Sequence, residues 1–303
     1  MSAIRGETRI GSRTFRWGER TFVMGILNAT PDSFSGDGLV ARGGAGAGQG
    51  NPAGRGTDPE HVCAEHVARA VAQARAMADE GADLLDVGGE STRPGHAPVT
   101  LDDELARVVP VLEAVRAALP DMPLTIDTTK LEVATAALDA GANAINDIWG
   151  VSDDDALARL AAQRGVPIVL MHNRAEPVYA NLVPEVLADL RRAIDTARRA
   201  GVPDDAILID PGIGFGKTAE HNLELLRDLG GLRQLGRPIL LGTSRKSTIG
   251  KVLDLPPEER VEGTLATTAL GIAAGVDVVR VHDVRANVRA ARMADAIVRG
   301  WRG

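Results

Sequence analysis

The chain contains a single cysteine, Cys63, in 303 residues, so it forms no internal disulfide. One thiol is typical of a reducing compartment, and we expect a cytoplasmic protein. Aromatic residues make up 3% of the chain although 44% of it is apolar, so Ala, Val, Leu and Ile must form the core. The sequence also lacks an uncharged apolar run of membrane-spanning length and an apolar signal region in its charged first twenty residues.

Basic residues are outnumbered: 34 Lys and Arg stand against 41 Asp and Glu, a net charge of −7. This balance disfavours nucleic acid or an anionic membrane as the main partner. An anionic substrate would therefore need a local basic patch.

Motifs for metal cages and activated nucleophiles are missing as well. The six histidines are scattered, with no His-Glu-x-x-His and no cysteine pair. No Gly-x-Ser-x-Gly elbow occurs. Any Mg²⁺ would be held mainly by substrate phosphate oxygens, with one or two protein ligands.

What the chain does contain is one repeated pattern, in which a short apolar segment ends in a polar residue and a turn and is followed by a helical segment. The predicted strands cover residues 22–27, 84–87, 124–126, 144–145, 168–170, 206–209, 239–241 and 278–281. The predicted helices cover residues 58–81, 102–119, 130–140, 153–164, 184–200 and 257–274, and two more end near residues 229 and 298. Left-handed glycine caps are expected at the helix ends Gly81, Gly141, Gly165, Gly201 and Gly275.

Eight such units predict an α/β fold, a (β/α)₈ TIM barrel. An open doubly wound sheet is disfavoured because no Gly-x-Gly-x-x-Gly follows the first strand. We expect one domain over residues 1–303. A short hairpin in residues 1–20, turning at Trp17 and Gly18, should cover one end of the barrel. Residues 41–56 are rich in glycine and are predicted to be a flexible insertion in the first strand–helix loop.

The stretch 209–218 reads Ile-Asp-Pro-Gly-Ile-Gly-Phe-Gly-Lys-Thr and places Asp210 at the end of its strand. The Gly-Lys-Thr ending is similar to a nucleotide phosphate loop. That motif requires glycine where this chain has Pro211, so we interpret the glycines as residues of a tight strand-to-helix turn.

In a TIM barrel, functional residues lie at the C-terminal ends of the strands. The polar or otherwise notable residues there are Asn28, Asp86, Asp127, Asn146, Met171, His172, Asp210, Lys246, Arg280 and His282. Carboxylates and an amide at Asp127, Asn146 and Asp210 suit a flat heterocycle with several N–H donors. Arg280, His282, Asn28 and Arg93 would form a separate basic corner for phosphate, with Lys246 between the two groups. The pattern predicts a nitrogen heterocycle that carries a phosphorylated leaving group.

Residues 24–35, Met-Gly-Ile-Leu-Asn-Ala-Thr-Pro-Asp-Ser-Phe-Ser, closely resemble the first signature of the dihydropteroate synthase family. Further matching stretches follow in the family's order: Asp-Val-Gly-Gly-Glu-Ser-Thr-Arg-Pro-Gly at 86–95, Ile-Asp-Thr at 126–128, Asn-Asp-Ile at 146–148, Asp-Pro-Gly-Ile-Gly-Phe-Gly-Lys at 210–217, Ser-Arg-Lys-Ser at 244–247 and Arg-Val-His-Asp at 280–283. The resemblance covers about residues 22–298. The glycine-rich residues 41–56 depart from the family pattern, since they lengthen its first loop.

The resemblance implies a transferase of folate biosynthesis that condenses 6-hydroxymethyl-7,8-dihydropterin pyrophosphate with 4-aminobenzoate through an SN1-like mechanism. It also implies Mg²⁺ as cofactor, sulfonamides as inhibitors and a homodimer. The residues implied to bind the pterin or line its pocket are Asp86, Asp127, Asn146, Met171, Asp210 and Lys246. Those implied for Mg²⁺ or pyrophosphate are Asn28, Arg280 and His282, and those bordering the aminobenzoate are Phe215, Lys246 and Ser247. Two loops would contribute Phe34 and Asp37, then Thr92, Arg93 and Pro94. Asp127, Lys246, Asp37 and Arg93 are the candidate catalytic residues.

Two other functions remain open from the sequence. A pterin-binding methyltransferase of the methyltetrahydrofolate–corrinoid type would share the barrel and the pterin acids, but it should not need the Ser-Thr-Arg-Pro or Ser-Arg-Lys-Ser stretches. A catalytically silent pterin-binding paralogue would explain the altered first loop.

Overall fold

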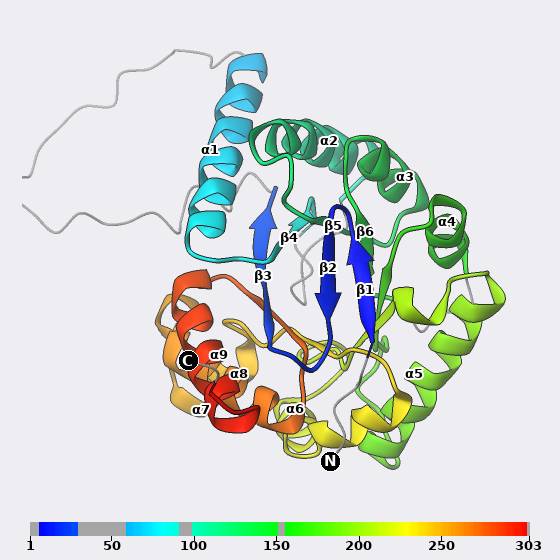
Figure 1. Cartoon of the computed structure of the whole chain (residues 1–303), viewed down its shortest axis with the longest axis vertical. Helices are drawn as coiled ribbons and strands as arrows, with labels where there is room; N and C mark the ends of the chain where they lie inside the picture. Colours follow the sequence, from blue (N-terminus) through cyan, green and yellow to red (C-terminus); the bar gives the residue numbers. More distant parts are fainter. Residues whose placement is uncertain (1–5, 30–58, 91–98, 151–154, 302–303) are drawn as a thin grey trace, which may run out of the picture.

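The chain forms a barrel of parallel strands surrounded by helices (Figure 1). The structure is a computed structural model that describes residues 6–29, 59–90, 99–150 and 155–301. Eight parallel strands are hydrogen-bonded in the order β8–β7–β6–β5–β4–β3–β10–β9. A parallel bridge between Ile209 and Ile239 joins the two edges of this sheet. The predicted TIM barrel is confirmed.

The barrel strands are β3 (Phe22–Asn28), β4 (Leu84–Gly88), β5 (Leu124–Asp127), β6 (Ala144–Asp147), β7 (Ile168–Met171), β8 (Ile207–Asp210), β9 (Leu240–Leu241) and β10 (Val278–Val281). The helices are α1 (Pro59–Asp79), α2 (Leu101–Ala118), α3 (Leu131–Asp139), α4 (Ala156–Arg164), α5 (Leu182–Arg199), α6 (Ala219–Arg227), α7 (Ser247–Leu253), α8 (Val261–Ala274) and α9 (Val284–Val298). The glycines predicted to cap helices all have positive φ, between 63° and 108°.

Two details differ from the sequence-based prediction. The hairpin of β1 (Glu7–Ile10) and β2 (Arg13–Arg16) turns at Gly11 and Ser12, not at Trp17 and Gly18. Gly18, with a φ of 82°, instead lies in the turn that leads from the hairpin into β3. The loop after β9 contains the additional helix α7, which was not predicted. A short helix without a capping side chain gives little signal in the sequence.

Side chains along each barrel strand alternate between the helices and the barrel interior. The interior layer near the N-terminal ends of the strands is apolar and packs with the hairpin. It consists of Phe22, Met24, Leu84, Ala144, Val169, Leu208, Leu240 and Val278. Two residues further along five of these strands stand Asp86, Asn146, Met171, Asp210 and Arg280. The barrel interior is therefore apolar at its N-terminal end and mainly polar at its C-terminal end.

The hairpin covers the N-terminal end of the barrel, as predicted (Figure 1). Phe15 packs on Trp17, with ring centroids 5.9 Å apart, and both rings contact Phe22. The Trp17 indole N–H donates to the Thr8 hydroxyl at 2.9 Å. Apolar closure at this end leaves the opposite end as the place for chemistry.

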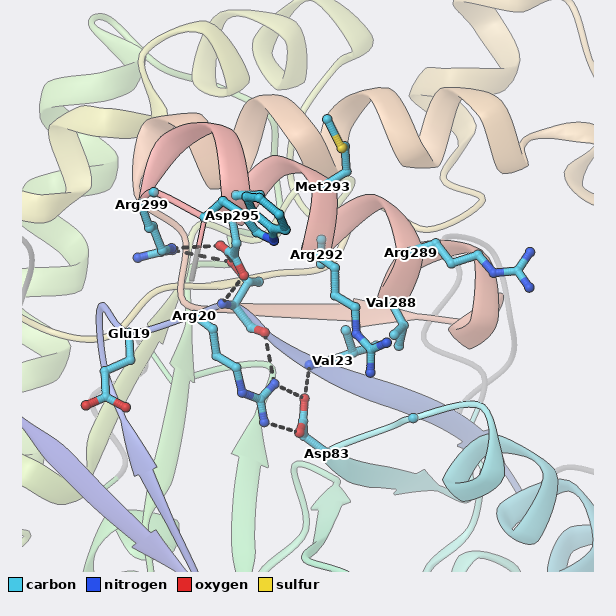
Figure 2. A pocket seen from close by; sticks show the side chains of 16 residues that line it. Glu19, Arg20, Val23, Asp83, Val288, Arg289, Arg292, Met293, Asp295 and Arg299 are labelled. Carbon is cyan, nitrogen blue, oxygen red and sulfur yellow. Dashed lines mark hydrogen bonds and ion pairs between the residues drawn. The ribbon is translucent and has the colours of Figure 1, made fainter. Parts of the chain in front are cut away.

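A surface cavity of about 950 Å³ lies beside the same N-terminal end, between the start of the barrel and α9. Figure 2 shows Arg20 paired with Asp83 and Arg299 paired with Asp295 on its lining. The Arg299–Asp295 pair is 2.7 Å long, and Asp295 also accepts from the Thr21 backbone N–H. These bonds tie α9 and β4 to the segment between the hairpin and β3.

Replacing Trp17 by Phe should lower the free energy of unfolding by about 1–2 kcal/mol, because a hydrogen bond and buried volume are lost together. Turnover should be unchanged, since Trp17 lies at the closed end. Urea unfolding of Trp17→Phe measures the change, and Trp301→Phe, at an exposed indole, is the matched control. Equal losses in the two variants would contradict the role of Trp17.

Candidate active site

A partly buried arginine between two buried carboxylates forms the centre of the C-terminal end. Arg280 of β10 donates from Nε to Asp86 Oδ2 at 2.6 Å and from Nη2 to Asp127 Oδ2 at 2.7 Å. Asp86 is fully buried on β4, and Asp127 ends β5. Burial opposes the charge of Arg280, but the two carboxylates together raise its pKa above the ordinary value.

This arrangement corrects the predicted separation of charges. Arg280 was expected in a basic corner away from the acids, but it lies among them. Sequence position placed Arg280 on the correct strand. The partners could not be predicted, because they come from β4 and β5, more than 150 residues earlier in the chain.

Asp127 has one buried oxygen available as an acceptor. Its Oδ1 makes no hydrogen bond within the described part of the chain, although it is shielded from solvent. Burial raises the pKa of Asp127 to about 7, while Arg280 acts in the opposite direction. A buried acceptor of this kind favours a ligand with an N–H donor, since an unpaired buried oxygen is costly.

Asn146 and Met171 lie on the same interior layer. Asn146, on β6 beside Asp127 in register, donates from Nδ2 to Asp86 Oδ2 at 3.0 Å. The Thr125 hydroxyl donates to the other oxygen of Asp86. Met171, buried at the end of β7, lies in register with Asp210 of β8. Both oxygens of Asp86 thus accept from protein donors, which suits a residue that orders the site.

The β8–α6 loop (residues 211–218) is the tight turn that the sequence predicted. Gly212 and Gly216 have φ values of 68° and 53°, and a Cβ there would lie 1.8 Å and 2.2 Å from the carbonyl oxygens of His172 and Arg174. Only glycine fits both positions. The Gly212 N–H donates to Asp210 Oδ1 at 2.7 Å. Burial raises the pKa of Asp210 to about 6, against this hydrogen bond and the nearby Lys246.

Lys246 and Phe215 come from two different loops at the C-terminal end of the barrel and contact each other. The Lys246 ammonium lies 3.8 Å from the centroid of the Phe215 ring, a cation–π contact. Lys246 directly precedes α7, whose first residue, Ser247, is exposed. Arg245 has a left-handed φ of 57° and is held by Asp283 at 2.7 Å. Sequence reasoning missed this pair, which fixes the backbone just before Lys246.

The remaining described candidates border this group. His282 Nδ1 lies 3.0 Å from the Ser244 hydroxyl, which also accepts from the His282 backbone N–H at 3.1 Å. Asn28 ends β3 and is partly exposed. Among the described residues there is no cluster of three or more His, Cys, Asp or Glu able to hold a metal ion.

Five predicted site residues and one predicted insertion lie outside the described residues. They are Phe34, Asp37, Thr92, Arg93 and Pro94, with residues 41–56.

Residues 59–282 match the family model described as pterin binding enzyme. The chain is 51% identical to dihydropteroate synthase from Clostridium beijerinckii, covering 96% of this chain and 99% of the relative. It is 47% identical to the synthase from Bacillus subtilis, covering 92% and 90%. The chain belongs to the dihydropteroate synthase family.

Solved members of this family share the fold closely. The synthase from Clostridium difficile, crystallised in the presence of pteroic acid, has a TM-score of 0.82 at 45% identity over 94% of this chain and 99% of its own. The synthase from Xanthomonas albilineans with 4-aminobenzoic acid has a TM-score of 0.82 at 40% identity over 96% and 97%. Across the described ranges, no helix is long and apolar enough to cross a membrane.

Proposed function

We propose that the chain condenses 6-hydroxymethyl-7,8-dihydropterin pyrophosphate with 4-aminobenzoate to give 7,8-dihydropteroate and pyrophosphate. The observation that carries this proposal is the buried, unpartnered Oδ1 of Asp127 inside a ring of acceptors. A dihydropterin presents parallel N–H donors to such acceptors. Family membership supplies the reaction, and the ring of acceptors supplies the reason for the pterin.

The pterin is proposed to lie against Asp127, Asn146, Asp210 and Lys246, with Asp86 and Met171 lining its pocket. The aminobenzoate would border Phe215, Lys246 and Ser247, and sulfonamides would compete there. Binding of sulfonamides is supported by a synthase from Yersinia pestis that has been solved in complex with a sulfonamide drug. Phe34, Asp37, Thr92, Arg93 and Pro94 are proposed to complete the site from the two loops.

Chemistry would begin with cleavage of the bond between the pterin methylene carbon and the pyrophosphate oxygen, which keeps the electron pair. Asp127 and Asp210 would stabilise the resulting pterin cation, because their charges are held in a buried site. The aminobenzoate nitrogen then forms the new C–N bond and loses a proton. Exclusion of water protects the cation in the meantime.

Pyrophosphate is proposed to bind Arg280 and His282. A guanidinium has five N–H donors, and Arg280 uses two of them for Asp86 and Asp127, so it can contact a phosphate at the same time. Asn28 would offer a side-chain oxygen to Mg²⁺, and a single ligand fits an ion held mainly by phosphate oxygens. When bound, Mg²⁺ would neutralise charge on the leaving pyrophosphate.

We also propose that the protein is a cytoplasmic homodimer. Light scattering on the purified chain tests the dimer, and a monomer mass at micromolar concentration would exclude it.

Purified protein should release pyrophosphate only when dihydropterin pyrophosphate, 4-aminobenzoate and Mg²⁺ are all present. Product formation is followed by chromatography of 7,8-dihydropteroate. Pterin binding without pyrophosphate release would instead favour the silent paralogue. Dependence on a corrinoid protein would favour the methyltransferase, which the high identity to synthases makes the weaker alternative.

A further inference from the structure

The lysine of the Gly-Lys-Thr stretch points into the protein. Lys217 Nζ donates to the carbonyl oxygens of Phe215 at 2.9 Å and Gly212 at 3.0 Å, and lies 2.8 Å from His172 Nδ1. The His172 carbonyl oxygen lies farther away, at 3.4 Å, so the three hydrogens of the ammonium are all taken by groups of the protein. Lys217 therefore binds its own loop, which excludes the phosphate-loop interpretation on geometry as well as on sequence.

The neighbour of Lys217 is held in one tautomer. An ammonium has no acceptor and a carboxylate has no donor, so His172 Nδ1 accepts from Lys217 while His172 Nε2 carries the hydrogen and faces Asp189. That Nε2 lies 3.1 Å from Asp189 Oδ2, which also accepts from Arg174 Nε at 2.9 Å. Burial and the Lys217 charge lower the pKa of His172 to about 3, so the imidazole is neutral. Asp189 of α5 thus orients His172, and His172 in turn binds the Lys217 ammonium.

Two further hydrogen bonds hold the β8–α6 loop in place. Tyr179 Oη donates to the Gly216 carbonyl at 2.8 Å, and the Gly214 N–H donates to Asn222 Oδ1 at 2.8 Å. Between these points lies Phe215, whose ring contacts the Lys246 ammonium. Its carbonyl is the nearest of the three that Lys217 binds, so the lysine acts directly on the residue that carries the ring.

We propose that Lys217 is a positioning residue that fixes the Phe215 ring against Lys246 and so shapes the aminobenzoate side of the site. This rests on the proposed function, which puts Phe215 beside the aminobenzoate. On the pterin side, the strand ladders of β5 and β8 place Asp127 and Asp210. Lys217 acts there only through its charge on Asp210 and its bond to the Gly212 carbonyl, so the pterin side depends less on it. Burial lowers the pKa of Lys217 to about 7, because the protein interior disfavours the charged ammonium.

Lys217→Met keeps the length of the side chain and removes the three donors. The KM for 4-aminobenzoate should rise by roughly 10- to 100-fold, since bonds from a charged donor are lost. The dissociation constant of the pterin substrate should change by no more than about threefold. Lys251→Met, at an exposed position on α7, is the matched control and should leave both constants unchanged. Equal changes in both constants of Lys217→Met, or no change in the KM, would overturn the proposal.

A second readout does not depend on catalysis. In ¹⁵N spectra of histidine-labelled protein, His172 Nδ1 should be unprotonated and should shift in Lys217→Met, but not in Lys251→Met. If the wild-type chain makes no dihydropteroate, the proposed function fails while this shift still tests the contact. If Lys217→Met does not fold, Tyr179→Phe removes one bond from the same loop and should raise the KM for 4-aminobenzoate by roughly threefold. An unchanged KM in Tyr179→Phe would then count against the proposal.

Discussion

Asp127→Asn should lower turnover by about 100- to 1000-fold, because it removes a buried charge that faces the developing pterin cation. Asparagine has nearly the same shape and still offers an oxygen, so the fold should persist. Single-turnover pyrophosphate release measures the chemical step apart from product release. Asp102→Asn, at an exposed carboxylate on α2, is the control and should keep full activity. Comparable activity in the two variants would remove Asp127 from the mechanism.

The same aspartate predicts a pH dependence. The pKa of Asp127 is raised to about 7, so below that pH the folded, ligand-free enzyme holds it protonated and neutral. A neutral carboxyl neither stabilises a cation nor accepts two N–H groups, so kcat/KM should rise with pH through about 7. Asp210, whose pKa is about 6, titrates nearby. The residual activity of Asp127→Asn should therefore change with pH only near 6, where Asp210 titrates. A wild-type profile that is flat from pH 6 to 8 would contradict this assignment.

Arg280→Met should lower the free energy of unfolding by about 3–5 kcal/mol at pH 8, because two buried carboxylates lose their counter-charge. The loss should be smaller at pH 5. An acid whose pKa is raised in the folded state contributes stability at low pH, and this stability is lost as pH rises through the folded pKa. In the wild-type protein Arg280 lowers the pKa of Asp127, so the pKa of Asp127 should be higher still in Arg280→Met.

The control for this variant is Arg285→Met on the surface of α9. Arg285 pairs with Glu80 at 3.3 Å in an exposed position, so its loss should cost at most about 1 kcal/mol. Arg280→Lys keeps a cation and should fall between the two. Urea midpoints at pH 5 and pH 8 measure all three variants. A loss in Arg280→Met that is no larger than in Arg285→Met, or that is independent of pH, would contradict the role of Arg280.

The fold was predictable because its signal is local and repeated. Each apolar segment, polar end and capping glycine is read within a few residues, and eight repeats admit few topologies. The position of the hairpin turn was wrong because glycine marks two consecutive turns here, at Gly11 and Gly18, and sequence alone does not say which one joins paired strands. Helix α7 was missed because its start depends on Arg245, whose left-handed conformation is set by contacts with distant residues.

Site residues were predictable as positions but not as pairs. Strand ends gave Asp127, Asn146 and Asp210 directly, since parallel strands bring their C-terminal ends together. The bond from Arg280 to Asp86 was not predictable, because it spans 194 residues and depends on barrel closure. Lys217 appeared in the sequence only as part of a false phosphate motif. Its inward direction depends on its contact with His172, which lies 45 residues earlier in the chain.

The apolar closure at the N-terminal end has a consequence for the order of folding. The hairpin is synthesised before the barrel strands, but Phe15 and Ile10 belong to a cluster that includes Leu208, Leu240 and Val278. Contacts of such large sequence separation form late, because a long chain must close before they are made. We therefore expect the hairpin, although it is synthesised before the barrel, to be among the last elements to gain protection from hydrogen exchange. Nascent chains that stop before β10 should still expose this hairpin to chaperones.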